Sequence, residues 1–323
     1  MKQSLRLLAA LGLALGFASS ALAAEEYPGR PIHILVGLSA GSTSDILARS
    51  VAQKMKEEWG EPVLVENRPG AGGINAASAV ASSAPDGYTL LLVSAGHAAT
   101  AAMFSKLPYD TLHDFAGVSR IVNVPSVLVV SPALGVKSVK DLIALAKSKP
   151  GQLNFSSPGI GSANHLAGEL FISLAGIQAV HVPYKGTPEA MGAVMADSIQ
   201  FNFSPVTNVT PLSHGGKLLA LAASTGKRMA SMPDLPTVAE AGVPGYRFDP
   251  WYGMLAPAKT PKALLDRLSG EVARIAELPD FREEMRSLGA EPAPSSPEAF
   301  DALVRSEVAK FSKIVRDANI KPE

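Results

Sequence analysis

Residues 32–49 read IHILVGLSAGSTSDILAR. The apolar, β-branched run over 32–36 predicts a buried strand of a parallel sheet. A loop of small residues follows, and apolar spacing predicts a helix over 44–58. This order predicts an α/β fold in which the N–H groups at the start of the helix face the carboxyl edge of the sheet. Such an edge is a site for an anion.

Within this stretch, GLSAG at Gly37–Gly41 matches the G-x-S-x-G nucleophile elbow of α/β-hydrolases. In an α/β-hydrolase, the oxyanion hole beside the nucleophile includes a backbone amide from a loop that follows an earlier strand of the sheet. The strand before GLSAG is the first predicted strand of the chain, so no earlier strand can supply that amide. We therefore favour an anion-binding loop and predict no catalytic residue. Asp45 is expected in the first turn of the helix, with Ser42, Thr43 or Ser44 as the N-cap. The candidate ligand residues here are Ser39, Ala40, Gly41, Ser42 and Thr43.

A second strand, loop and helix occur at Leu153–Leu170, LNFSSPGIGSANHLAGEL. Glycines in its loop allow the backbone to approach a ligand closely. The stretch is not a G-x-G-x-x-G dinucleotide motif, because Asn164 occupies the place of the last glycine, and no cofactor is predicted. The candidate ligand residues here are Ser157, Gly159, Gly161 and Ser162.

The N-terminus has the pattern of a secretory signal peptide over residues 1–23. Lys2 and Arg6 precede an uncharged run that ends in Ala21-Leu22-Ala23. We expect cleavage near Ala23/Ala24; a membrane anchor is the alternative, but the run is short for one. The chain has no cysteine, so neither a disulfide nor a cysteine lipid anchor is possible. The signal-peptide pattern and the absence of a lipid anchor favour a periplasmic location for the mature protein.

Composition excludes several classes of function. The chain has 29 basic and 29 acidic residues, so it lacks the excess of positive charge that is typical of nucleic-acid-binding proteins. The six histidines are scattered and show no metal-ligand spacing, so no metal site is predicted. A monomer is expected.

Strand and helix patterns alternate along the chain, which predicts parallel sheets joined by right-handed crossovers. The predicted strands are 32–36, 62–67, 88–94, two within 117–132, 152–157, 179–184, 198–203, 218–224 and an extended 248–257. The predicted helices are 44–58, 74–83, 139–148, 164–175, 187–195, 263–276, 279–288 and 297–318.

The pattern restarts near the middle of the chain, which predicts two α/β lobes. The chain is expected to cross to the second lobe near 124–129 and to return near 251–256. Lobe one would hold 24–125 and 253–323, including the C-terminal helices, and lobe two 126–252. Two crossings are typical of a hinged protein that closes on a ligand in the cleft.

Several motifs resemble one known family from about Tyr27 to the C-terminus. They are VENRPGAGGINAA, PDGYTLLL, HVPYKGTPEAM, PDLPTVAEAGVPGY and WYGMLAPAKTP, in addition to the two loops above. Together they resemble the Bug family, the periplasmic solute-binding proteins of tripartite tricarboxylate transporters. The resemblance implies a two-lobed periplasmic-binding-protein fold that closes on a small carboxylate and delivers it to membrane permease subunits. It implies that amides of Ser39–Thr43, with ordered waters, hold one carboxyl group opposite Ser157–Ser162.

The chain departs from the family pattern at several loop positions. Gly37, Leu38, Ala40 and Ser42 stand where Pro, an aromatic residue, Pro and a second Gly are common. Gln200 stands where the family often has an Asp that reads an ammonium group, which favours a carboxylate without an amine. The remaining candidates follow predicted strands and are Ser94, His97, Tyr184, Lys185, Gln200 and Phe203.

The predicted function is therefore a receptor, and not an enzyme, for a di- or tricarboxylate or an aromatic acid. Two alternatives remain. One is a sensory receptor that presents the same ligand to a signalling partner. The other is an exported serine hydrolase that uses Ser39.

Overall fold

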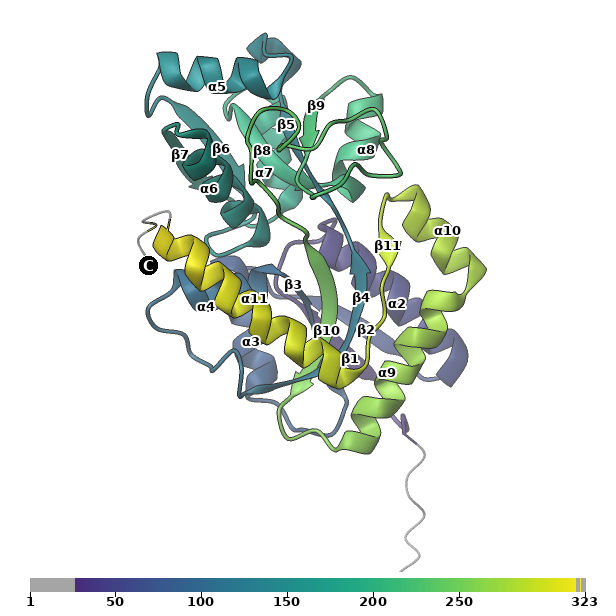
Figure 1. Cartoon of the computed structure of the whole chain (residues 1–323). Helices are drawn as coiled ribbons and strands as arrows, with labels where there is room; N and C mark the ends of the chain where they lie inside the picture. The colour runs from purple at the N-terminus through teal and green to yellow at the C-terminus, as the bar shows by residue number, and fades with distance from the viewer. Residues whose placement is uncertain (1–26, 318–319, 321–323) are drawn as a thin grey trace, which may run out of the picture.

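The computed structural model of the chain describes residues 27–317 and 320. The predicted signal peptide and its cleavage site lie outside the described residues. Two lobes, each built on one β-sheet, lie one above the other (Figure 1). The predicted two-lobed α/β fold is confirmed.

Lobe one contains a six-stranded sheet in the order β11-β4-β10-β3-β1-β2. Its strands are β1 (Ile32–Val36), β2 (Val63–Asn67), β3 (Thr89–Ser94), β4 (Phe115–Asn123), β10 (Trp251–Pro257) and β11 (Glu291–Pro292). Its helices are α2 (Thr43–Trp59), η1 (Ala71–Gly73), α3 (Ile74–Ala81), α4 (Gly96–Met103), α9 (Lys262–Glu277), α10 (Pro279–Ser287) and α11 (Pro297–Asp317).

Lobe two contains a five-stranded sheet in the order β7-β6-β8-β5-β9. Its strands are β5 (Ser126–Val130), β6 (Leu153–Ser157), β7 (Ala179–Pro183), β8 (Phe201–Pro205) and β9 (Leu219–Ala223). Its helices are η2 (Pro132–Leu134), α5 (Val139–Ser148), α6 (Ala163–Ala175), α7 (Thr187–Met195) and α8 (Val206–His214).

The prediction of all-parallel sheets is wrong beside the crossings between the lobes. β10 runs antiparallel to β3 and β4, and β5 runs antiparallel to β8 and β9. The reason is topological. β1, β3, β6 and β8 end at the boundary between the lobes, whereas β5 and β10 enter their sheets from the other lobe and therefore begin at that boundary.

Two helices were not predicted from the sequence. α4, GHAATAAM, is made of small residues whose spacing gives little amphipathic signal. α8, VTNVTPLSH, contains β-branched residues and Pro211, all of which lower helix propensity. Both helices lie at the boundary between the lobes, where contacts across it stabilise them.

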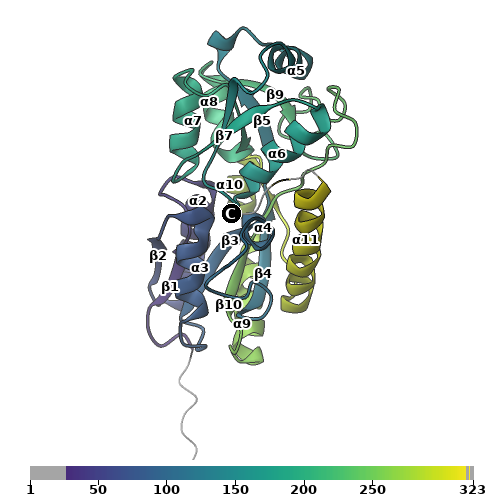
Figure 2. The same cartoon turned by 90° about the vertical axis from the view of Figure 1, so that its left-hand side faces the viewer.

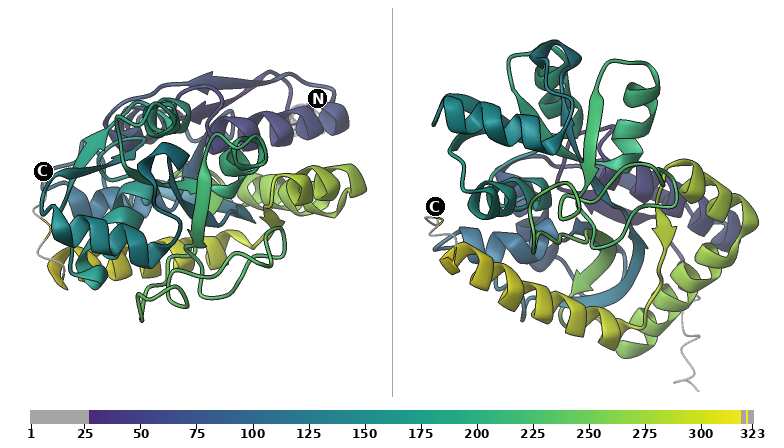
Figure 3. Two further views of the ribbon diagram at one scale, coloured as in Figure 1. Left: turned by 90° about the horizontal axis from the view of Figure 1, so that it is seen from above. Right: turned by 45° about the horizontal axis from the view of Figure 1, so that its top comes forward.

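Helices cover both faces of the six-stranded sheet. α2 and α9 pack on one face with Ile32 and Ile34, while α3, α4 and α11 pack on the other with Leu35 (Figure 2). This alternation follows from the two-residue period of a strand. α11 lies along one side of the molecule, and its Phe300 meets the Trp251 ring at 5.3 Å between centroids (Figure 3).

Gly253 allows the close packing of α11 on β10. A Cβ atom at this position would overlap the ring of Phe300 and lie 2.8 Å from the carbonyl oxygen of Ser119. We predict that Gly253→Ala lowers the free energy of unfolding by about 1–3 kcal/mol through overpacking, measured by urea denaturation.

Gly270→Ala in α9 is the matched control, because an added Cβ there meets no atom within 4 Å. It should leave stability unchanged or raise it by about 0.5–1 kcal/mol through helix propensity. Equal stability of the Gly253→Ala variant and the wild type would contradict the packing described here.

Candidate functional site

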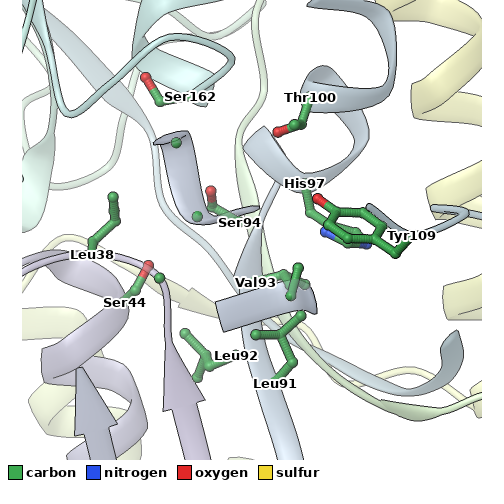
Figure 4. A pocket seen from close by; sticks show the side chains of 14 residues that line it. Leu38, Ser44, Leu91, Leu92, Val93, Ser94, His97, Thr100, Tyr109 and Ser162 are labelled. Atoms are coloured by element: carbon green, nitrogen blue, oxygen red, sulfur yellow. The ribbon is translucent and has the colours of Figure 1, made fainter. Parts of the chain in front are cut away.

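A small cavity of about 40 Å³ lies at the boundary between the lobes (Figure 4). Lobe two contributes Ser162, and lobe one contributes the rest of the wall. The lobe-one residues are Gly37, Leu38, Ser44, Gly72, Gly73, Ala77, Leu91, Leu92, Val93, Ser94, His97, Thr100 and Tyr109. In the view of Figure 4, the apolar side chains of Leu91, Leu92 and Val93 lie at the lower end of the cavity, and the hydroxyls of Ser94, Thr100 and Ser162 lie at its upper end.

The loop after β1 presents the N-terminus of α2 to this cavity. Ser42 is the N-cap, and its Oγ accepts a hydrogen bond from the Asp45 amide at 3.4 Å. Gly41 has φ +77° and donates its amide to Asp45 at 3.0 Å. Within residues 27–317 and 320, the amides of Thr43 and Ser44 donate to no acceptor. The positive end of α2 thus has two free N–H groups.

Asp45 occupies the first turn, as predicted. Arg49 donates its Nε to this carboxylate at 3.0 Å. Although burial opposes it, the hydrogen bonds from Arg49 and Gly41 hold the pKa of Asp45 below its usual range. Asp45 therefore organises the loop from within lobe one, and the loop keeps its free amides for another anion.

Three serine hydroxyls from three elements line the cavity: Ser44, Ser94 and Ser162. The Oγ of Ser94 accepts from the Gly96 amide, and the Oγ of Ser162 accepts from the His165 amide, both at 3.2 Å. A hydroxyl that accepts a hydrogen bond still has its own hydrogen to donate. Figure 4 shows these side chains around the same space. The arrangement offers converging neutral donors.

His97 follows β3, as predicted, and lies in the first turn of α4. Its ring stacks on Tyr109, 5.8 Å between centroids, and meets the edge of Phe115. Burial lowers the pKa of His97 to about 4, so the ring is neutral near pH 7. Its Nε2 is buried and has no hydrogen-bond partner among the described residues. A buried polar atom of this kind calls for a partner.

No charged side chain lines the cavity, and Lys185 does not reach it. Lys185 is exposed in the turn between β7 and α7. Tyr184, its neighbour, is half-buried and donates its amide to the Ser157 carbonyl at 2.9 Å. The structure therefore places these two candidates outside the cavity.

Ser157, Gln200 and Phe203 have internal partners instead. Ser157 donates its hydroxyl to the Gly159 carbonyl at 3.0 Å and lies 2.6 Å from Nε2 of His181. Gln200 accepts from the Asn154 amide at 2.8 Å, at the end of the sheet away from the cavity. The buried Phe203 ring stacks on Tyr246.

The error at Gln200 comes from the start of its strand. β8 begins at Phe201 and not at Ser198, because Ser198 and Ile199 both donate their amides to Ala193 in a turn. Asn202, and not Gln200, lies beside Ser156 in the register. Because Gln200 lies away from the cavity, its identity says nothing about whether the ligand carries an ammonium group.

Gly159 and Gly161 bring the lobes into contact. Both have positive φ, +127° and +77°. A Cβ on Gly159 would lie 3.1 Å from the amide nitrogen of Gly72 in lobe one, and one on Gly72 would overlap the Ile160 carbonyl. The glycines of η1, which we did not single out as ligand residues, thus form both the cavity wall and the contact between lobes.

Ser39 and Ala40 lie at the rim of the cleft. Ala40 is exposed, and Ser39 donates its hydroxyl to Oε2 of Glu189 on α7 at 3.1 Å. A serine nucleophile needs an adjacent base, usually histidine, and no histidine contacts Ser39 in the described part of the chain. The G-x-S-x-G match in the loop between β1 and α2 is therefore not a nucleophile elbow.

A second contact joins the α2 loop to α8, and sequence reasoning missed it. Oγ1 of Thr43 lies 2.7 Å from Oγ1 of Thr207 and 2.7 Å from Oδ1 of Asn208. Nδ2 of Asn208 donates to the Gly41 carbonyl at 3.1 Å. We name this set, Gly41, Thr43, Thr207 and Asn208, the latch. It holds the lobes together beside the cavity.

Two histidines lie beneath the loop that follows β6. The rings of His165 and His181 stack at 3.8 Å between centroids, and Nδ1 of His165 accepts from the Gly161 amide at 3.3 Å. Glu169 lies 3.4 Å from Nε2 of His165. Burial and then the neighbouring His165 lower the pKa of His181 to about 3.

Residues 27–317 and 320 contain neither a metal-binding cluster nor a membrane-spanning helix. No group of three or more His, Cys, Asp or Glu side chains there could hold a metal ion. No helix there is long and apolar enough to cross a bilayer.

Comparison with known proteins gives a consistent result. Residues 47–320 match the model of the tripartite tricarboxylate transporter family receptor. The structure of the periplasmic binding protein BugD is 33% identical, with a TM-score of 0.88 over 92% of this chain and 100% of that one.

Two similar structures contain a ligand. R. palustris Rpa4515 with adipate is 34% identical, with a TM-score of 0.89 over 92% of this chain and 100% of that one. MatC from Rhodopseudomonas palustris with bound malate is 30% identical, with a TM-score of 0.85 over 90% of this chain and 100% of that one.

The latch stabilises the closed arrangement of the lobes seen in this structure. Asn208→Ala removes hydrogen bonds to both Gly41 and Thr43. We expect the lobes to separate, with a larger radius of gyration in small-angle X-ray scattering and a ligand affinity lower by about tenfold. Thr210→Ala, on the same helix, is the control, because its hydroxyl bonds within α8 to Val206. An unchanged radius for Asn208→Ala would show that the latch does not hold the lobes.

The stacked histidines predict acid sensitivity. An unfolded histidine takes up a proton near pH 6.5, whereas the folded chain keeps His181 neutral down to about pH 3, so stability falls as the pH drops between these values. Replacing the residue by His181→Gln should reduce the loss of unfolding free energy between pH 7 and pH 5 by about 2 kcal/mol.

Chemical denaturation at the two pH values measures this loss. His214→Gln is the control, because this side chain is exposed at the end of α8, and it should lose as much stability as the wild type. The same loss in His181→Gln as in the wild type would contradict the proposed origin of the acid sensitivity.

Proposed function

Since the chain belongs to the tripartite tricarboxylate transporter receptor family, whose members are periplasmic solute-binding receptors and not enzymes, we propose that it captures a small dicarboxylate between its lobes. The carboxylate would occupy the cavity beside the N-terminus of α2. Of the residues predicted from the sequence, the proposal retains Ser94, His97 and Ser162, which line the cavity, and the amide of Thr43 at the adjacent helix end. It adds Ser44.

One observation carries the proposal: neutral donors converge on a cavity that has no cation. The donors are the hydroxyls of Ser44, Ser94 and Ser162 and the free amide of Ser44, and the free amide of Thr43 lies next to it at the same helix end. Hydrogen bonds to a charged group contribute roughly 1.5–3 kcal/mol each. Four of them contribute roughly 6–12 kcal/mol, a range that includes the about 8 kcal/mol of micromolar affinity.

The cavity also supports a ligand without an amine. A bound ammonium group would need a carboxylate, and neither Asp nor Glu lines the cavity. The unpartnered Nε2 of His97 supplies a further position for a ligand oxygen when that nitrogen carries the proton of the neutral ring.

Size favours a short acid. One water needs about 10–15 Å³ of comparable volume, so a cavity of about 40 Å³ holds a few heavy atoms in the closed form. Related proteins have been solved with adipate and with malate. We propose a four-carbon dicarboxylate such as malate. Because malate has nine non-hydrogen atoms, the cavity as it stands holds one of its carboxyl groups, and the lobes would separate to admit the rest; a longer diacid would require wider separation.

Delivery of the ligand to membrane permease subunits completes the proposal. The closed form brings α2 and α8 together through the latch, so a permease could distinguish it from the open form. The signal-peptide pattern of residues 1–23 supports export to the periplasm. This reading requires no cofactor.

Ser162 provides the most specific test of the binding site. We predict that Ser162→Ala weakens malate binding by about 10–100-fold, measured by isothermal titration calorimetry, because a hydrogen bond to a carboxylate is lost. Ser138→Ala is the matched control. Each serine is the N-cap of a helix, α6 or α5, and accepts an amide of the first turn, but only Ser162 lines the cavity.

The two variants should therefore lose similar stability, while only Ser162→Ala loses affinity. The wild type is first refolded from denaturant to remove retained ligand. Absence of binding by the refolded wild type to malate, succinate and adipate would contradict dicarboxylate capture. Equal affinity of both variants would remove Ser162 from the site.

A further inference from the structure

A larger groove lies where the chain crosses between the lobes. Its volume is about 940 Å³, and it shares no lining residue with the cavity described above. Volumes of 300–1,000 Å³ are typical of small-molecule sites. Both crossings form part of its wall, through Pro125 and through Asp249–Trp251, and α11 forms another part.

The segment between β9 and β10 closes the groove from the side of lobe two. Figure 3 shows this segment beside α11, and the rings of Phe248 and Phe311 meet at 5.7 Å between centroids. The groove is therefore a built feature held by packing on both sides.

Five of the eight charged residues that line the groove are basic, and the acidic ones are Asp249, Glu291 and Glu307. Three of its five cations have carboxylate partners: Arg228 pairs with Glu240, Arg247 with Asp249, and Lys310 with Glu307. The other two, Arg120 and Lys227, have no acidic partner within residues 27–317 and 320.

Arg120 is the more informative of these two cations. It is half-buried, and its Nε donates to the Ala293 carbonyl at 2.8 Å. Burial lowers the pKa of Arg120, because no anion offsets the lost hydration. Its two terminal NH₂ groups form the planar fork that suits an acid group.

Two buried polar atoms of the groove residues also have no hydrogen-bond partner in the described part of the chain. They are Nε1 of Trp251, a donor, and Oε2 of Glu307, an acceptor. Trp251 is 2% exposed and Glu307 is 9% exposed, so bulk water does not solvate these atoms. Buried polar groups without partners are rare and call for an explanation.

We propose that this groove binds a second small ligand, a hydroxy acid. Its carboxylate would pair with Arg120 and Lys227 and accept from Trp251, and its hydroxyl would donate to Glu307. The assignment does not depend on the function proposed for the cleft.

Tryptophan fluorescence offers a local readout, because the chain has only two tryptophans, Trp59 and Trp251. In a Trp59→Phe protein, emission reports on Trp251 at the groove. Malate and succinate, which differ by one hydroxyl, are the probes. We expect a saturable change with both, tighter for malate by about tenfold, from the one extra hydrogen bond to Glu307.

Substitutions assign this change to the groove. Arg120→Gln should abolish it, and Lys227→Gln, on an exposed side chain, should weaken it by about 3–10-fold. Glu307→Gln should instead tighten succinate binding, because it removes a negative charge beside the acid group. Opposite signs from residues of one groove are not expected from a general loss of structure.

Ser162→Ala separates the groove from the cleft. If the cleft also binds malate, a second phase appears that weakens in Ser162→Ala and persists in Arg120→Gln. If the cleft does not bind, one phase remains, and Arg120→Gln removes it. A fluorescence change that survives both Arg120→Gln and Lys227→Gln, or no saturable change at all, would overturn the proposal.

Discussion

The direction of four strands determines most of what this molecule can do. β1, β3, β6 and β8 all end at the boundary between the lobes, so the helices that follow them begin there. The amides at the start of α2 and the Ser162 cap of α6 consequently meet at one cavity. The antiparallel β5 and β10 preserve this arrangement, because each enters its sheet from the opposite lobe.

Neutral donors suit a receptor that must also release its ligand. A buried cation such as lysine would bind a carboxylate more tightly, but it would remain unpaired and costly in the empty protein. Serine hydroxyls and helix amides are hydrated at little cost when the lobes open. The one charged pair at the α2 loop, Asp45 with Arg49, is internal to lobe one and stabilises the loop whether or not ligand is present.

Much of the fold was predictable because local signals were strong. β1, α5 and α7 have the predicted limits, and Ser42 is one of the three predicted caps. α4 and α8 were missed because small and β-branched residues carry a weak helical signal. Both helices are stabilised by tertiary contacts, which override propensity.

The site was less predictable, because it depends on register and on contacts between lobes. Gln200 was misplaced by the turn that delays the start of β8. Ser157 has the residue type of a ligand contact, but its hydroxyl is occupied within its own loop. Gly72 and the latch residue Asn208 become relevant only when the lobes meet, and no local pattern indicates that contact.

A crystal structure of the refolded protein with malate tests the central claim most directly. We expect closed lobes with one carboxylate at the N-terminus of α2, within hydrogen-bond distance of Ser44, Ser94 and Ser162. Malate bound elsewhere in the cleft, on charged side chains and away from these three serines, would contradict it.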